Sequence, residues 1–216
     1  MSWLARLELD TDLLKRLKIL DTYDWHKRLW HCFPNAPEQK RDFLTRIDLL
    51  EGAVRAWLLS EREPLRPEWC PAEAFVAKEI APGFLLHKHY AFDLRANPTK
   101  VLIQRGPDGS PMRRKNGKSS LGKRVPLISR EDLKGWIDRK AAEAGFRISE
   151  ARPLEIGPMV EHHFRERENR GYHGGVQFRG ILEVTDPARF SQAYFKGIGS
   201  AKGFGFGLLL LSPVQP

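Results

Sequence analysis

The chain has 216 residues, of which 41% are hydrophobic and 29% charged, so it can fill one large core or two small ones and is not mainly disordered. Its 36 Lys and Arg residues exceed its 27 Asp and Glu residues, which favours a polyanionic partner but does not separate RNA, DNA and anionic lipid. With only Cys32 and Cys70, neither a disulfide framework nor a cysteine-rich zinc site is expected. No stretch approaches the ~20 apolar residues of a membrane span and the start has no signal-peptide core, so we expect a soluble, cytoplasmic protein.

The first elements in chain order are a strand and a helix. Residues 3–9 alternate apolar with charged or polar side chains, the period of two of a half-buried strand. Either Asp21 or Thr22 can cap a helix, and apolar residues then recur at helical spacing until Pro34. We therefore predict a helix over residues 22–33.

A hairpin and a connector follow. Glu51-Gly52 separates two apolar runs, which predicts a hairpin within residues 43–59. The segment from Arg62 to Pro82 carries four prolines and little periodicity, so it is expected to be a connector in which residues 75–80 form a short edge strand.

From near His87 onward, the pattern alternates between strands and helices. Ser129 caps a predicted helix that ends at Gly145. Asp186, followed by proline, begins a second helix that reaches about Gly197. Apolar or alternating runs predict strands over residues 90–95, 146–151, 176–184 and 206–212.

The order of these elements indicates the fold class. The second part of the chain gives strand, helix, strand, strand, helix, strand, and the first part supplies at least the first four of these. We therefore predict an α+β fold of two tandem ferredoxin-like (RRM-like) βαββαβ domains, residues 1–86 and 87–216. A cleft between two such domains would suit a nucleic-acid backbone, although fold alone does not establish function.

One candidate site lies at the start of the first predicted helix. Tyr23 and His26 are three positions apart and therefore neighbours on one helix face, while Lys27 and Arg28 add positive charge. An imidazole that titrates near pH 6.5 can move a proton to or from a ribose or a leaving oxygen, and cations can stabilise the phosphorane. This set is similar to a metal-free ribonuclease site. From spacing alone, ordinary residues on an amphipathic helix remain the alternative.

The glycine-rich stretch 197–207 invites comparison with a nucleotide loop. It lacks the Gly-Lys followed by Ser or Thr that a Walker motif requires, and it follows a predicted helix instead of preceding one. Both features argue against ATP binding. Its backbone and Lys202 can approach a nucleic-acid phosphate, or its glycines can let a neighbouring domain pack closely. Phe204 and Phe206 resemble the start of an RNA-recognition signature. That signature belongs to the third strand of its domain, whereas these residues lead into the last one, which favours core or interface residues.

Two further segments are basic. One has six cations and no acid, which favours phosphate contact over a merely solvated loop; its cations are Arg113, Arg114, Lys115, Lys118, Lys123 and Arg124. The other lies in a predicted loop between strands and contains Arg165, Arg167 and Arg170. Neighbouring glutamates reduce its positive charge, so phosphate contact and a solvated loop are equally favoured. Histidines elsewhere show no metal-ligand spacing, so no metal and no cofactor are expected.

Four segments together resemble the CasE (Cse3) family, the CRISPR-associated endoribonucleases that process precursor CRISPR RNA in the E-subtype Cascade system. They occur in the family's order across nearly the whole chain and are residues 23–30, 94–99, 123–127 and 197–210. The resemblance implies metal-independent cleavage at the base of a repeat hairpin, leaving a 2′,3′-cyclic phosphate and a 5′ hydroxyl. It also implies that the guide RNA is retained, so the expected partners are the hairpin RNA and other Cascade subunits, with no membrane partner and a monomer when free.

Residue by residue, the resemblance makes His26 the catalytic histidine and Tyr23 the partner that helps to orient the 2′ hydroxyl or the phosphate. Where the family has an arginine directly after the histidine, this chain has Lys27 followed by Arg28, which leaves open which cation meets the scissile phosphate. The implied attack by an internal 2′ hydroxyl needs no metal-activated water.

The other basic segments are candidates for holding the hairpin stem, because a duplex is recognised largely through its shape and backbone. They are residues 113–124 and 165–170. At the glycine-rich end, Gly203 and Phe206 stand where the family commonly has Ala and Cys. Two alternatives to the enzyme remain: a non-catalytic hairpin-RNA-binding subunit of a ribonucleoprotein, and a basic DNA-binding protein.

Overall fold

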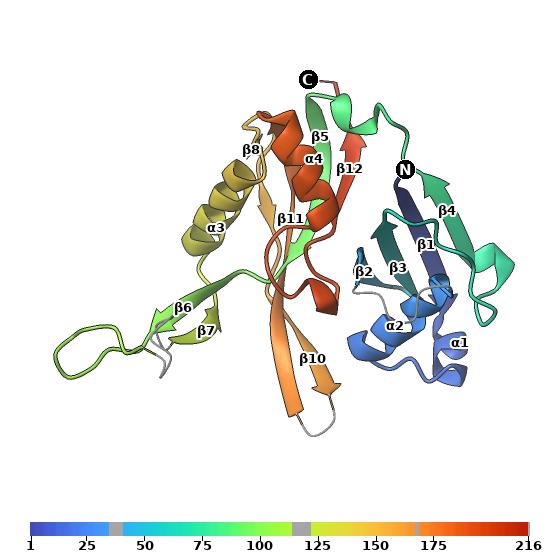
Figure 1. The fold of residues 1–216 in the computed structure, drawn as a ribbon, viewed down its shortest axis with the longest axis horizontal. Helices are drawn as coiled ribbons and strands as arrows, with labels where there is room; N and C mark the ends of the chain where they lie inside the picture. The colour runs from blue at the N-terminus through green and yellow to red at the C-terminus, as the bar shows by residue number, and fades with distance from the viewer. Residues whose placement is uncertain (35–40, 114–121, 167–168, 216) are drawn as a thin grey trace.

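The structure is a computed structural model that describes residues 1–34, 41–113, 122–166 and 169–215, with the backbone alone described for 162–166 and 169–171. The fold is mixed α/β and contains two antiparallel sheets that stand side by side (Figure 1). We refer to them as the first and the second sheet.

The first sheet has the strand order β2-β3-β1-β4, and neighbouring strands are antiparallel. Its members are β1 (Trp3–Asp10), β2 (Phe43–Leu50), β3 (Ala53–Ser60) and β4 (Phe75–Glu79). The predicted alternation in the first strand is confirmed, since Ala5, Leu7 and Leu9 are all buried. The predicted hairpin and edge strand are confirmed too, and Gly52 makes the hairpin turn with a left-handed φ of 72°.

Two helices connect β1 to β2. The first, α1 (Thr11–Arg16), was not predicted, because six residues are too few to show helical periodicity. The second, α2 (Thr22–Leu29), is capped by Asp21, whose Oδ1 accepts hydrogen bonds from two backbone N–H groups at 2.8 and 2.9 Å. The predicted helix over 22–33 is too long: the α-helix ends at Leu29 and a 3₁₀ turn, η1 (Trp30–Cys32), continues it.

The second sheet has the order β10-β11-β5-β12, with two short strands that also pair with β11. Its members are β5 (His89–Ala96), β8 (Phe146–Ile148), β9 (Glu155–Ile156), β10 (Val160–Glu166), β11 (Asn169–Val184) and β12 (Leu209–Pro213). Both predicted helices are present with their predicted caps as α3 (Arg130–Glu143) and α4 (Pro187–Lys196). Both helices lie on the same face of this sheet (Figure 1).

Three predictions in this part need correction. Arg165 and Arg170 lie on strands and not in a loop: β10 and β11 are antiparallel neighbours in which Arg165 pairs with Arg170. Lys123 and Arg124 lie on a strand, β7 (Gly122–Pro126), which pairs with β6 (Thr99–Ile103) to form an arm that leaves the body of the molecule (Figure 1). The last strand begins at Leu209 and not at residue 206, because Gly205 and Gly207 have left-handed φ values of 86° and 87°.

The two sheets are joined by shared apolar packing. One core cluster fills the space between the first sheet and α1 and α2. The other lies between the second sheet and its helices, with Trp136 stacked on Phe178 at 5.9 Å, and it includes Leu44 and Leu59 from the first sheet. The outer face of β2 and β3 is therefore covered by the second half of the chain.

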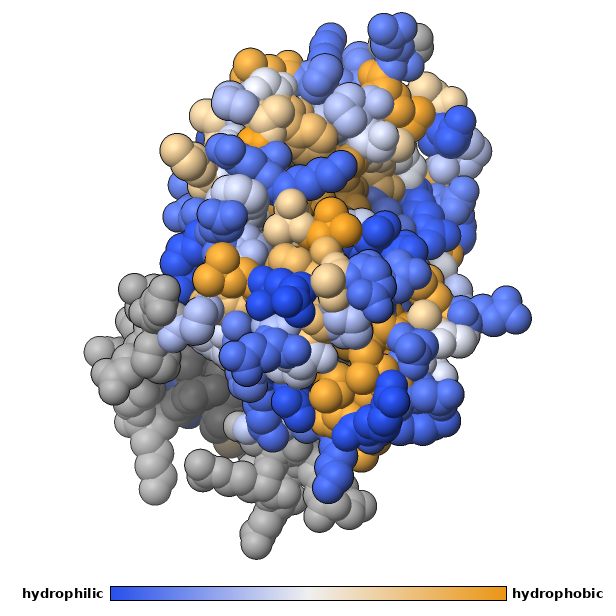
Figure 2. All heavy atoms as spheres, turned by 90° about the vertical axis from the view of Figure 1, so that its right-hand side faces the viewer, coloured by the Kyte–Doolittle hydropathy of each residue, from blue (hydrophilic) through white to orange (hydrophobic). Residues whose placement is uncertain are grey.

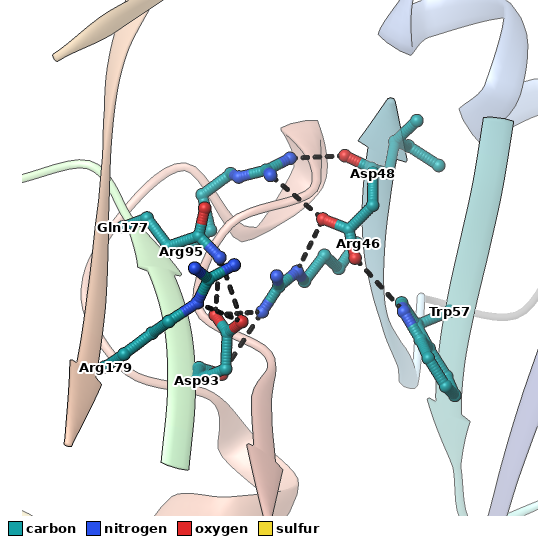
Figure 3. Close-up of polar contacts among 8 residues, drawn as sticks. Arg46, Asp48, Trp57, Asp93, Arg95, Gln177 and Arg179 are labelled. Atoms are coloured by element: carbon teal, nitrogen blue, oxygen red, sulfur yellow. Dashed lines mark hydrogen bonds and ion pairs between the residues drawn. The ribbon is translucent and has the colours of Figure 1, made fainter. Parts of the chain in front are cut away.

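A polar network reinforces this junction (Figure 3). Arg46 on β2 places Nε 2.8 Å from Asp48 Oδ1 and Nη1 2.7 Å from Asp93 Oδ1 on β5. Arg95, also on β5, places Nη2 2.9 Å from the same Asp48 oxygen. The remaining hydrogen bonds of the two carboxylates come from Trp57, Gln177 and Arg179. Charged groups buried at this junction are thus paired with one another.

The side of the molecule that lies to the right in Figure 1 carries mainly hydrophilic side chains with smaller apolar areas between them (Figure 2). Within the described residues, no helix has both the length and the apolar character needed to span a bilayer.

Candidate functional site

Helix α2 carries the predicted catalytic residues to the junction of the two sheets. Trp25 and Leu29 are buried in the first core and fix the helix on its sheet. Helix α2 also packs against β10 and against a 3₁₀ turn of the glycine-rich stretch, η4 (Lys202–Phe204). The fold therefore brings the N-terminal histidine and the C-terminal glycine-rich segment together.

His26 is half-buried at this junction. Its Nε2 accepts a hydrogen bond from Trp30 Nε1 at 3.4 Å, and the two rings meet edge to face at 6.4 Å. Its Nδ1 is buried and has no hydrogen-bond partner among the described residues. Burial lowers the pKa of His26, and the positive charge of Arg41 lowers it further. The imidazole is therefore neutral at neutral pH, and one of its ring nitrogens has no partner in the part of the chain that the structure describes.

The cations next to His26 on the helix are engaged locally. Lys27 Nζ lies 4.1 Å from the centroid of the Tyr23 ring and 3.8 Å from Asp24 Oδ1. Arg28 Nη2 donates a hydrogen bond to the backbone oxygen of Leu17 at 2.9 Å. The helix thus keeps Tyr23 and Lys27 together, while Arg28 is tied to the loop that precedes the helix.

A further cation, Arg41, was missed by the sequence analysis. It directly precedes β2, and its guanidinium lies over the Phe43 ring at 5.2 Å and donates to Thr45 Oγ1 at 3.3 Å. Its Nε is buried and without a partner among the described residues, and burial lowers the pKa of Arg41 to about 10. No local sequence pattern marks this residue, because its closeness to His26 depends on how β2 and α2 pack.

The glycine-rich stretch packs closely on the first sheet, one of the two roles that the sequence left open. A Cβ on Gly197 would lie 2.9 Å from Leu44 Cδ1 on β2, and a Cβ on Gly207 would lie 2.6 Å from Ile198 O within the stretch itself. Lys202 Nζ donates to the backbone oxygen of Lys196 at 2.6 Å. Phe206 is buried, and the His173 ring lies 4.5 Å from Phe204 and 6.0 Å from Phe206, as expected for core or interface aromatics.

A basic groove of about 520 Å³ runs between α3, α4 and the glycine-rich stretch. We call it the α3–α4 groove. Its lining includes one acid, Glu143, and the cations Arg124, Arg139, Lys140, Arg189, Lys196 and Lys202. Only Arg124 and Lys202 were predicted as phosphate-binding residues, because the other four come from separate helices and form no run in the sequence. Such a concentration of positive charge suits a polyanion.

The other predicted basic residues are divided between two places. Lys123 and Arg124 are exposed on β7, and Arg113 lies on the same arm, on the opposite side of the molecule from α2 (Figure 1). Arg165 and Arg170 face each other across the β10–β11 hairpin, whose strand β10 packs against α2. Arg114, Lys115, Lys118 and Arg167 lie outside the described residues. The fold thus places the strand that carries Arg165 against the helix of His26, and the arm with Lys123 on the other side of the molecule.

Metal ligands do not gather in the part of the chain that the structure describes: no group of three or more His, Cys, Asp or Glu side chains there could hold an ion. Cys32 and Cys70 are both buried, and burial raises the pKa of the Cys32 thiol to about 12 and that of Cys70 to about 11. Both thiols are therefore protonated and unreactive at neutral pH.

Known proteins match the whole chain. The model of a family described as CRISPR associated protein matches residues 2–213. The Cascade subunit CasE of Escherichia coli is 29% identical over 195 residues, which cover 90% of this chain and 93% of that protein. The CRISPR-associated endoribonuclease Cse3 of Thermus thermophilus is also 29% identical, covering 98% of this chain and 100% of that protein. A solved structure of T. thermophilus Cse3 bound to an RNA representing a pre-cleavage complex has a TM-score of 0.73 and 27% identity, covering 98% of this chain and 99% of its own.

These matches extend over both sheets and are not confined to one part of the chain. They confirm the resemblance to CasE (Cse3) that four sequence segments indicated. Because the family model extends over nearly all of the 216 residues, the chain belongs to this family of CRISPR-associated proteins.

Proposed function

We propose that the protein is an endoribonuclease that binds the repeat hairpin of precursor CRISPR RNA and cuts it at the base without a metal ion. The observation that carries this proposal is the half-buried imidazole of His26, neutral at neutral pH and next to cations where the two sheets meet. The names of the relatives agree with it: one is an endoribonuclease and one is a subunit of Cascade.

In the proposed reaction, the 2′ oxygen next to the cut forms a bond to phosphorus while the bond from phosphorus to the 5′ oxygen breaks. His26 takes the proton of the 2′ hydroxyl on Nε2, the nitrogen that accepts the Trp30 hydrogen bond in the free protein, and the resulting imidazolium returns a proton to the leaving 5′ oxygen. The products are a 2′,3′-cyclic phosphate and a 5′ hydroxyl. The nucleophile belongs to the substrate, so no metal-activated water is required.

Tyr23 is assigned to orienting the 2′ hydroxyl or the phosphate. It lies one helical turn before His26, and its ring holds the Lys27 ammonium at 4.1 Å. A single substrate group that reaches the imidazole can therefore meet the phenol as well.

We assign binding of the hairpin stem to the basic surface of the second half of the chain. The α3–α4 groove and the β10–β11 hairpin border the glycine-rich stretch and α2, so phosphates held there would leave the cut close to His26. The arm, with Arg113 and Lys123, would contact a more distant part of the RNA, whereas Arg124 lines the α3–α4 groove. Retention of the product and its transfer into a Cascade complex complete the proposal.

The architecture proposed is two tandem ferredoxin-like domains, residues 1–86 and 87–216. The strand orders support it: reversed, the first sheet runs β4-β1-β3-β2, and the second runs β12-β5-β11 followed by the short strands β8 and β9 and by β10. In the first domain a 3₁₀ turn, η2 (Ala72–Ala74), stands where the second helix of a βαββαβ unit would lie.

The test is cleavage of the cognate repeat hairpin by purified protein in excess EDTA. We expect one cut at the hairpin base, and we expect it to disappear when the nucleotide before the cut is 2′-deoxy, because the nucleophile is then absent. Binding of the RNA without cutting would support a non-catalytic RNA-binding subunit instead. Equal affinity for the DNA version of the hairpin would support a DNA-binding protein.

A further inference from the structure

We infer that Arg41 binds the scissile phosphate and is a further catalytic residue of the site. The inference rests on the proposed function and deepens it, since it identifies the cation that the sequence left undecided between Lys27 and Arg28. Three observations carry it: the position of the guanidinium, its lack of a carboxylate partner, and the engagement of the two competing cations.

The first observation is position. The Arg41 guanidinium lies over the Phe43 ring at 5.2 Å, and the Trp30 ring, which contacts His26, meets the same Phe43 ring at 4.9 Å. Its Nη1 also lies 3.4 Å from the place where a Cβ on Gly203 would stand, so it reaches the glycine-rich stretch. The guanidinium and the imidazole are therefore linked through one pair of aromatic rings, and Arg41 also reaches η4, the turn that packs against α2.

The second observation is charge. Asp42, the carboxylate next to Arg41 in sequence, is engaged in a bidentate contact with Arg62, with both distances 2.6 Å. Among the described residues Arg41 forms no ion pair, its only side-chain hydrogen bond is to Thr45 at 3.3 Å, and its Nε is buried without a partner. A buried cation without a counter-ion is costly, and its guanidinium fork matches two oxygens of a phosphate. An anionic ligand would supply the negative charge and the hydrogen-bond acceptors that the described residues do not provide.

The third observation is that Lys27 and Arg28, the other candidate contacts of the scissile phosphate, are already engaged. Arg28 is bonded to the Leu17 backbone oxygen at 2.9 Å, and Lys27 lies across the Tyr23 ring and near Asp24. Neither has an unpaired buried nitrogen, whereas Arg41 has. When the phosphorane forms, an additional negative charge develops on its non-bridging oxygens, and a guanidinium held there stabilises it more than the ground state.

The experiment is single-turnover cleavage of hairpin RNA by the full chain carrying Arg41→Ala or Arg41→Lys. We expect Arg41→Ala to slow cleavage by about 10²- to 10³-fold while the Kd for the hairpin changes by less than about threefold, because one phosphate contact among many contributes little to binding. Arg41→Lys keeps the charge and loses the fork, so it should recover about tenfold, and guanidinium ion added to Arg41→Ala should recover part of the rate.

A sulfur substitution tests the contact itself. Replacing one non-bridging oxygen at the cut by sulfur should slow the wild-type protein by about tenfold or more for one diastereomer. In Arg41→Ala the ratio of the rate on the oxygen substrate to the rate on the sulfur substrate should be clearly smaller, because the contact that sulfur weakens is already absent from this variant. A thermal melt of each variant separates this effect from unfolding.

Arg62→Ala is the matched control. Arg62 also stacks on an aromatic ring, 4.4 Å from Phe33, but it is paired with Asp42 and should leave the cleavage rate and the sulfur effect unchanged. Wild-type rates in the folded Arg41→Ala protein, or an undiminished sulfur effect, would overturn the inference while leaving the proposed function intact. If the wild-type protein does not cut at all, the proposed function fails first.

Discussion

Two arginines near the start of β2, Arg46 buried and Arg41 partly buried, stand in contrasting surroundings. Arg46 is 2% exposed and lies between Asp48 and Asp93 at 2.8 and 2.7 Å. Burial alone would lower the pKa of Arg46, but its hydrogen bonds to Asp93 and the charges of both carboxylates raise it above its ordinary value. Arg41, five positions earlier, has no such partners among the described residues, and burial lowers its pKa to about 10.

The difference separates a residue that holds the fold together from one that is available for a ligand. A buried charge with complete partners belongs to the structure, since its hydrogen bonds are made before any substrate arrives. A buried charge with unmade hydrogen bonds is retained at a cost, which points to a role in binding or catalysis. His26, with its unpartnered Nδ1, falls in the second class with Arg41.

The largest effect is expected from His26→Ala. Loss of the proton-transferring group should reduce the single-turnover cleavage rate by about 10²- to 10⁴-fold, while the Kd for the hairpin stays within about threefold. Rapid-quench cleavage and a filter-binding titration on the same preparation measure the two quantities. Cleavage at the wild-type rate by a folded His26→Ala protein would remove the imidazole from the mechanism and place it among structural residues.

Arg46→Ala should be next, and its effect is on stability. Removal of a buried ion-paired side chain leaves two carboxylates short of partners, so the free energy of unfolding should fall by about 3 kcal/mol. Urea denaturation followed by tryptophan fluorescence measures it. Arg41→Ala, which breaks no ion pair, should cost less than about 1 kcal/mol; equal losses for the two variants would erase the proposed distinction.

The pH dependence of cleavage sharpens the link between Arg41 and His26. The pKa of His26 lies below its ordinary value of 6.5 because of burial and the charge of Arg41. A general base must be neutral, so the rate should rise with pH through the His26 pKa and level off above it. In Arg41→Ala the positive charge is gone, the pKa of His26 rises, and the midpoint of the profile should move to higher pH. Rates measured from pH 5 to 8 check this, and an unmoved midpoint would show that the two groups do not interact.

The smallest effect is expected from Gly203→Ala. The added Cβ would lie 3.4 Å from Arg41 Nη1, at the limit of an ordinary contact. The guanidinium can adjust by a few tenths of an ångström, so cleavage should slow by less than about tenfold without loss of stability. Comparison with Gly135→Ala, whose Cβ would meet nothing within 4 Å, controls for the general effect of losing a glycine.

Much of the fold could be predicted from local patterns. The alternation in β1, the cap before α3 and the proline after Asp186 are signals carried by neighbouring residues, and all are confirmed. Tyr23 and His26 could be found as a pair because one helical turn links them. Helix α1 is too short for periodicity, and the β10–β11 hairpin was mistaken for a loop because its glutamates and arginines obscure any alternation of apolar residues.

What could not be predicted depends on contacts between distant segments. Arg41 reaches the site only because Phe43 at the start of β2 packs against Trp30 in the turn that follows α2. The α3–α4 groove forms only when cations meet from two helices, namely Arg139, Lys140, Arg189 and Lys196. Neither arrangement leaves a run or a period in the sequence. The polar network between the two sheets is hidden for the same reason, since Arg46 and Asp93 are 47 positions apart.

The most direct measurement of the central claim is the chemistry of the two RNA ends after a single cut. Attack by the internal 2′ hydroxyl, with His26 moving the proton, predicts a 2′,3′-cyclic phosphate on the upstream fragment and a 5′ hydroxyl on the downstream one, both resolved by mass spectrometry of the products. A 3′ hydroxyl on the upstream fragment and a 5′ phosphate on the downstream one would mean that water is the nucleophile, and would contradict the account.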